Sequence, residues 1–123
     1  MTPGATGPGV GPAILVAALL TVALAGLAGV SRMLAGGTLG PNPLVGIRLA
    51  ALLASEQAWQ HGHRAAVRPL TVAAVLGFLA LVGSVVASGD VLWYLVFLCI
   101  ALAVVIIGVI VAAVVAVRAA KRV

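Results

Sequence analysis

Three long stretches without a charged side chain dominate the sequence, at residues 12–31, 70–88 and 91–117. An α-helix rises 1.5 Å per residue, so about 20 residues cross the roughly 30 Å hydrocarbon core of a bilayer. The chain of 123 residues is 64% hydrophobic and 7% charged, which leaves too little polar surface for a soluble domain of this length. The pattern predicts an all-α integral membrane protein with three transmembrane helices.

The breaks between these stretches divide the chain into segments. Pro and Gly without charged neighbours predict a flexible N-terminal tail, because such a segment buries too little to order itself. The first apolar stretch contains Ala23-Leu24-Ala25, which has the small-x-small pattern of a signal-peptide cleavage site, but no Lys or Arg precedes Arg32, so a membrane span is favoured. The predicted segments are a tail at 1–11, spans at 12–34, 70–88 and 91–117, a polar segment at 35–69 and a basic tail at 118–123.

The basic residues predict the orientation. Positive charges accumulate on the cytoplasmic side of membrane proteins, and the N-terminal tail and the turn at Asp90 carry none. Trp93 and Tyr94 follow that turn, where aromatic rings favour the outer interface. We therefore expect the N-terminus outside and the C-terminus in the cytoplasm. The seven basic residues are Arg32, Arg48, Arg64 and Arg68, between the first two apolar stretches, and Arg118, Lys121 and Arg122, after the third.

Small residues recur at four-residue spacing in two of the spans. Lipid gives helices no hydrophobic drive to associate, so close backbone approach through small residues matters more. We expect these rows to pack against helices of this chain or of a partner protein. No charged residue lies within the three apolar stretches at 12–31, 70–88 and 91–117, which disfavours a channel or an ion-coupled transporter. The rows are Ala17, Thr21, Ala25 and Gly29 in the first span, and Gly108, Ala112 and Ala116 in the third.

The polar segment contains a second helical pattern, from residue 44 to about residue 67. Spacings of three and four place leucines and larger polar residues on one side of such a helix. This pattern predicts an amphipathic helix between the first two spans, which lies either in the inner membrane interface or beneath the cytoplasmic ends of the spans. The residues on that side are Leu49, Leu52, Leu53, Glu56, Trp59, Gln60 and His63.

The residues of this segment predict no catalytic, metal or cofactor site. His61 and His63 are two apart and point to different sides of a helix, and Cys99 is the single cysteine. No nucleophile triad, paired carboxylates or phosphate-binding Gly loop occurs. The excess of basic residues follows the membrane topology and does not indicate nucleic-acid binding. Glu56 has two open interpretations, an ion pair that fixes the segment or a contact with a partner.

The order Pro-Asn-x-x-x-Gly-Ile-Arg, Ser-Glu-x-Ala-Trp and His-Arg resembles the signature of the SdpI family of small bacterial membrane proteins. Leu49 and Leu52 stand where family members usually have Thr. The resemblance implies a non-enzymatic, multi-pass protein of the bacterial inner membrane, and family-motif residues that contact a partner. Those motif residues are Asn42, Gly46, Ile47, Arg48, Ser55, Glu56, Trp59, His63 and Arg64.

Three functions follow as hypotheses. The first is a small accessory subunit that stabilises a larger membrane assembly, such as a transport complex, through contacts with other integral membrane proteins and membrane lipid. The second, implied by the resemblance, is immunity against a toxic peptide or signalling, with Arg48, Glu56, Trp59 and His63 presented to a cytoplasmic partner. The third is a small transporter or lipid-handling protein, which needs a polar cavity. We identify no small-molecule substrate from the sequence.

Overall fold

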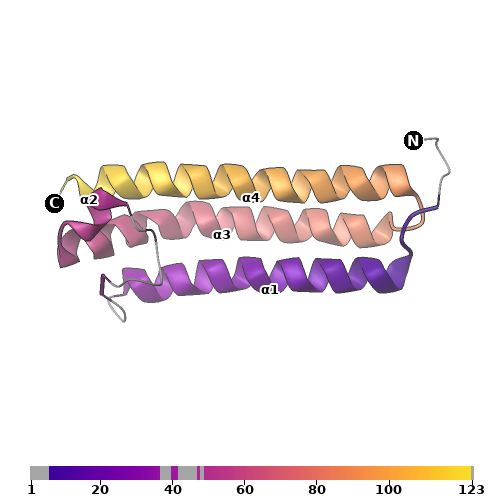
Figure 1. Cartoon of the computed structure of the whole chain (residues 1–123), viewed down its shortest axis with the longest axis horizontal. Helices are drawn as coiled ribbons and strands as arrows, with labels where there is room; N and C mark the ends of the chain where they lie inside the picture. Colours follow the sequence, from indigo (N-terminus) through magenta and orange to yellow (C-terminus); the bar gives the residue numbers. More distant parts are fainter. Residues whose placement is uncertain (1–5, 37–39, 42–46, 48, 123) are drawn as a thin grey trace.

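The computed structural model describes residues 6–36, 40–41, 47 and 49–122 of the chain. Its helices are α1 (Val10–Ala35), α2 (Ala50–Leu53), α3 (Glu56–Val86) and α4 (Val91–Ala120). The three long helices lie side by side with α3 in the middle, and the short α2 lies at the end where the chain terminates (Figure 1). Each of the three long helices has the length and apolar composition to cross a membrane. The all-helical prediction is therefore confirmed.

The N-terminal tail pairs with the turn between α3 and α4. The Gly7 amide donates to the Gly89 carbonyl at 3.2 Å, and the Gly9 amide donates to the Ser88 carbonyl at 3.2 Å. Gly7 lies so close to the Ser88 carbonyl oxygen that no Cβ atom would fit there. Gly9 has a φ of 87°, a conformation that suits glycine. The described part of the predicted flexible tail is thus held by backbone hydrogen bonds.

Helix α3 joins two segments that the sequence predicts as separate. It begins after Ser55, whose side chain accepts a hydrogen bond from the Ala58 amide at 2.9 Å, and it continues through Pro69 to Val86. Proline removes one backbone hydrogen bond from a helix, but buried helices tolerate this where packing holds both sides. Ala66 and Leu70 flank Pro69 and are buried in the core, so the packing keeps the helix continuous.

The predicted amphipathic helix is divided at the start of α3. Ser55 has an extended backbone, with φ of −159° and ψ of 167°, so α2 and α3 are separate helices. Leu52, which is fully buried, folds back onto α3 at Gly62. A Cβ atom at Gly62 would lie 2.6 Å from Leu52 Cδ2, so the glycine makes room for the leucine. Leu52 therefore packs on α3 in the same cluster as Trp59, whereas Leu53 is exposed, so the predicted side does not form one stripe on one helix.

Helices α3 and α4 form an antiparallel hairpin, and α1 packs on the other side of α3. Asp90 caps α4 by accepting a hydrogen bond from the Leu92 amide at 3.0 Å. Gly108 of α4 approaches the Cβ atom of Ala73 so closely that a side chain at position 108 would clash. In the described part of the chain, α1 and α4 have no Cα atoms within 8 Å of each other. The three helices thus form a layer and not a closed bundle.

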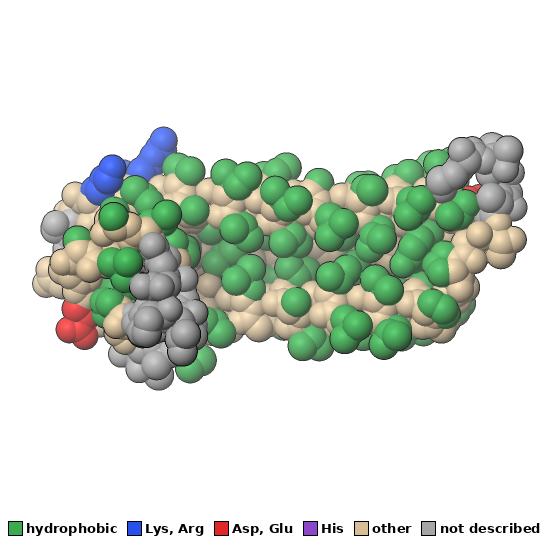
Figure 2. Space-filling model, viewed as in Figure 1, with side chains coloured by type: hydrophobic (Ala, Val, Ile, Leu, Met, Phe, Trp, Pro, Cys, Tyr) green, Lys and Arg blue, Asp and Glu red, His purple; other side chains and the backbone are tan. Residues whose placement is uncertain are grey.

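Apolar side chains cover the length of the layer, and Lys and Arg side chains are seen at the end that holds the C-terminus (Figure 2). The arrangement follows from the topology, because α1 and α4 end where α3 begins. We call this end the basic end. Its described members are Arg32 of α1, Arg64 and Arg68 of α3, Arg118 of α4, and Lys121 and Arg122 beyond it.

Candidate functional site

His63 connects the segment before α2 to helix α3. Its side chain is fully buried, its Nδ1 lies 2.8 Å from the Trp59 carbonyl oxygen, and its Nε2 lies 2.9 Å from the Ile47 amide nitrogen. The Ile47 amide can only donate, so Nε2 accepts. Nδ1 must then carry the proton and donate to the Trp59 carbonyl. Both ring nitrogens of a neutral imidazole are therefore used to hold Ile47 against α3.

Burial favours the neutral form of His63. The residue precedes Arg64, outside the apolar part of α3 that starts at Leu70. Desolvation lowers the pKa of His63 below its ordinary value of 6.5, and the bond to the Trp59 carbonyl opposes this shift. The protonation state that the Ile47 contact needs is thus the state that the surroundings stabilise.

Trp59 is the largest fully buried side chain of the site. Its ring lies 4.3 Å from the His63 ring, centroid to centroid, at an angle of 54°. It belongs to a hydrophobic cluster that draws on all four helices, with Leu34 from α1, Leu52 from α2 and Ala116 from α4. Trp59 therefore packs residues of all four helices against one another at the basic end. Because its side chain is fully buried, a partner cannot contact it in this conformation.

The exposed side of the site is polar. Glu56 lies in the first turn of α3, where a negative charge is favoured by the helix dipole, and it is exposed. Glu56 makes no ion pair with any residue that the structure describes. Four other exposed side chains of α3 follow one another at spacings of four, three and four, which places them along one face. We call them the polar face of α3: Gln57, His61, Arg64 and Arg68.

Of the polar face, Arg64 is among the predicted motif residues, whereas Gln57, His61 and Arg68 were not predicted as site residues. The spacing of three and four that defines this face is present in the sequence, but the predicted contact side is the one with the leucines and Trp59, on the opposite side of the helix. Glu56 and Ser55 are exposed beside this face, whereas Trp59 and His63 are buried. The structure thus separates the predicted motif residues into a buried group and a surface group. Asn42, Gly46 and Arg48 lie outside the described residues.

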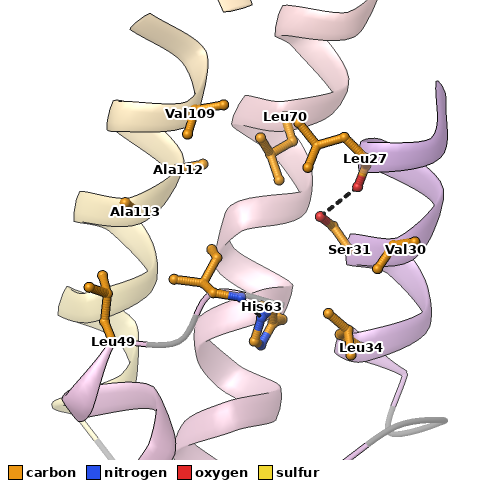
Figure 3. A pocket seen from close by; sticks show the side chains of 11 residues that line it. Leu27, Val30, Ser31, Leu34, Leu49, His63, Leu70, Val109, Ala112 and Ala113 are labelled. Atoms are coloured by element: carbon orange, nitrogen blue, oxygen red, sulfur yellow. Dashed lines mark hydrogen bonds between the residues drawn. The ribbon is translucent and has the colours of Figure 1, made fainter. Parts of the chain in front are cut away.

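A cavity of about 370 Å³ opens beside His63, between α1, α3 and α4. Figure 3 shows His63 with Leu34 of α1 and Leu70 of α3 among its lining residues. Ser31 is the other polar side chain in the lining, and its Oγ donates to the Leu27 carbonyl at 2.8 Å. The polar groups of His63 and Ser31 are already bonded within the protein. The cavity therefore offers an apolar surface, and its chemistry suits hydrocarbon better than a polar substrate.

The predicted helix-packing residues fall into two groups. In α4, Ala112 and Ala116 are 1% and 0% exposed and Gly108 meets Ala73, so this row faces α3. In α1, Ala17 and Thr21 are partly buried, whereas Ala25 and Gly29 are exposed and Gly29 has open space where a Cβ atom would lie. The row in α1 therefore becomes more exposed along the helix, from Ala17 toward Gly29.

No metal site is formed by the residues that the structure describes. Among them, no three His, Cys, Asp or Glu side chains come together. Cys99, which lies on α4, is exposed. The chemistry of the site is thus that of packing, hydrogen bonding and surface charge.

Comparison with known proteins finds a family match that includes the residues of the site. The profile of the SdpI/YfhL protein family matches residues 38–117, which cover the site, α2, α3 and most of α4. No curated protein and no solved structure matches the chain. The resemblance inferred from the motif residues is confirmed.

Proposed function

The chain belongs to the SdpI/YfhL protein family, and we propose that it is a non-enzymatic accessory subunit that binds another integral membrane protein through its basic end. The polar face of α3 is the observation that carries the proposal. It presents Gln57, His61, Arg64 and Arg68 on a helix whose opposite side is fixed by Trp59 and His63. A rigid, charged surface next to the membrane suits a contact with the cytoplasmic loops of a larger protein.

The orientation is part of the same proposal. The described basic residues of all three long helices lie at one end, and cytoplasmic segments of membrane proteins are enriched in Lys and Arg. We place this end in the cytoplasm of a bacterial cell and the N-terminal tail outside. The face then lies where a cytoplasmic or membrane partner can reach it.

The division of the motif residues indicates how the site works. Ser55 starts α3, and His63 and Trp59 hold α2 and Ile47 against it. These residues set the position of the polar face, and the exposed Glu56 and Arg64 contribute to the contact itself. Hydrogen bonds from Arg64 to a partner carboxylate would be charge-assisted and therefore among the stronger ones at such a surface.

Site-specific photo-crosslinking tests the proposal in native cells. A photoreactive amino acid is placed at Arg64 or at Gln57, and the matched control carries it at Leu79, which is exposed on the apolar part of the same helix. We expect one discrete adduct with an integral membrane protein from the first two positions, identified by mass spectrometry. The control should give lipid adducts and no discrete protein band. Adducts only with lipid from all three positions would refute the proposed contact.

A further inference from the structure

A second groove lies between α3 and α4 and shares no lining residue with the cavity beside His63. Its volume is about 490 Å³, within the range of lipid- and drug-sized sites. Val72 and Leu76 of α3 and Ile107 and Val111 of α4 contribute to its walls. Arg68 is the charged side chain in the lining, so the groove is apolar along its length and carries a positive charge at Arg68.

The close approach of the two helices forms the floor of this groove. Gly108 meets Ala73 there, and both residues line the groove. Small residues at the contact and larger ones on either side leave a furrow, because the branched side chains stand away from the helix axes. The groove is therefore a consequence of the packing that holds the hairpin.

Both helices that form the groove carry arginines at the basic end. Arg64 precedes Arg68 by four residues and so lies on the same side of α3. On α4, Arg118 follows the lining residue Val115 by three residues and Val111 by seven, so it lies on the same side of that helix. Because α3 and α4 are antiparallel, these three arginines lie at the same end of the groove.

We propose that this groove binds an anionic phospholipid of the leaflet at the basic end. An acyl chain lies along Val72, Leu76 and Val111, and the lipid phosphate is bound by Arg68 and Arg64. Arginine binds phosphate oxygens through two parallel hydrogen bonds, and basic pockets between transmembrane helices on the cytoplasmic side are recognised sites for anionic headgroups. A zwitterionic lipid offers the same hydrocarbon, but its headgroup also carries a cation, which the arginines repel.

Native mass spectrometry of the full chain in mild detergent tests this site. Phosphatidylglycerol and phosphatidylcholine with identical acyl chains are titrated separately, and the fraction of protein that carries one lipid is measured. We expect tighter binding of phosphatidylglycerol. Replacing Arg68→Gln should weaken it about fivefold, the value of one arginine next to an anionic membrane lipid. Arg32→Gln is the matched control, because Arg32 lies at the basic end on α1 and outside the groove.

A pair of substitutions on α4 tests the place of the acyl chain. Val111→Trp fills the groove, whereas Val114→Trp adds the same side chain at an exposed position that does not line it. The first should lower the binding of phosphatidylglycerol and the second should leave it unchanged. Equal binding of the two lipids, or equal effects of Arg68→Gln and Arg32→Gln, would overturn the proposal. So would a dimer that Val111→Trp dissociates, since the groove would then hold a second copy of the chain.

Discussion

The His63 side chain supplies the hydrogen-bond acceptor that a helix or strand would otherwise give to the Ile47 amide. The Ile47 amide lies outside any helix, and a buried amide without a partner costs free energy. The imidazole supplies that partner and uses its other nitrogen to fix its own orientation on the Trp59 carbonyl. The sequence predicts His63 as a motif residue but not its role. Its hydrogen bond joins residues 16 apart in the sequence, and no local pattern specifies such a contact.

Replacing His63→Ala should loosen the segment that contains Ile47. The substitution leaves the Ile47 amide without its acceptor and opens space beside Trp59, which together cost about 2–4 kcal/mol. Hydrogen exchange measured by mass spectrometry should show faster exchange at Ile47, while amides in the middle of α4 keep their protection. His61→Ala, which removes an exposed imidazole two residues away, is the control. Unchanged protection at Ile47 would exclude the hydrogen bond to His63.

The same contact should depend on pH. The pKa of His63 is lowered in the folded protein, so the loosened state binds more protons and docking of the segment becomes more favourable as pH rises. The docking free energy is fully present above the ordinary pKa of 6.5 and falls as pH drops below it. Exchange at Ile47, corrected for the intrinsic pH dependence, should therefore accelerate below pH 6.5. A corrected rate that stays constant down to pH 5 would contradict this.

At the scale of elements, hydrophobic length predicts three long helices, which the structure contains, whereas packing decides where α3 begins. The first span was predicted at 12–34, and α1 runs from Val10 to Ala35. The second was placed after Pro69, whereas α3 begins earlier, at Glu56. A proline after a polar stretch usually marks a helix boundary, but in α3 Ala66 and Leu70 are buried against neighbouring helices on either side of Pro69, which favours a continuous helix.

The hairpin of α3 and α4 depends on the absence of a side chain at Gly108. Gly108→Val should force the two helices apart at Ala73 and destabilise the protein by about 1–3 kcal/mol. Gly26→Val is the control, because the space around Gly26 is open and valine there faces outward from α1. The measurement is thermal unfolding in detergent, with the apparent Tm lower for the first variant alone. Equal losses in both variants would show that helix propensity, and not helix contact, sets the effect.

At the scale of the whole molecule, the described structure is a layer held together by its middle helix. Helices α1 and α4 have no close backbone contact in the described part of the chain, and their side chains meet α3 in the cluster around Trp59 and in a second cluster that contains Leu24 of α1, Leu81 of α3 and Ala101 of α4. The sequence predicts three spans but not their order in space, because apolar residues surround each membrane-spanning stretch and give no preferred face. The layer leaves open surfaces, and the groove between α3 and α4 that we propose as a lipid site is one of them.

The orientation of this layer decides where each surface lies, and single-cysteine labelling in intact cells measures it directly. With Cys99 replaced by serine, one variant carries Gly89→Cys in the α3–α4 turn and the other carries Gln57→Cys on the polar face; both positions are exposed. A membrane-impermeant maleimide should label Gly89→Cys in intact cells and Gln57→Cys only after the membrane is opened. Labelling of Gln57→Cys in intact cells, with Gly89→Cys protected, would place the basic end outside and contradict the proposed function.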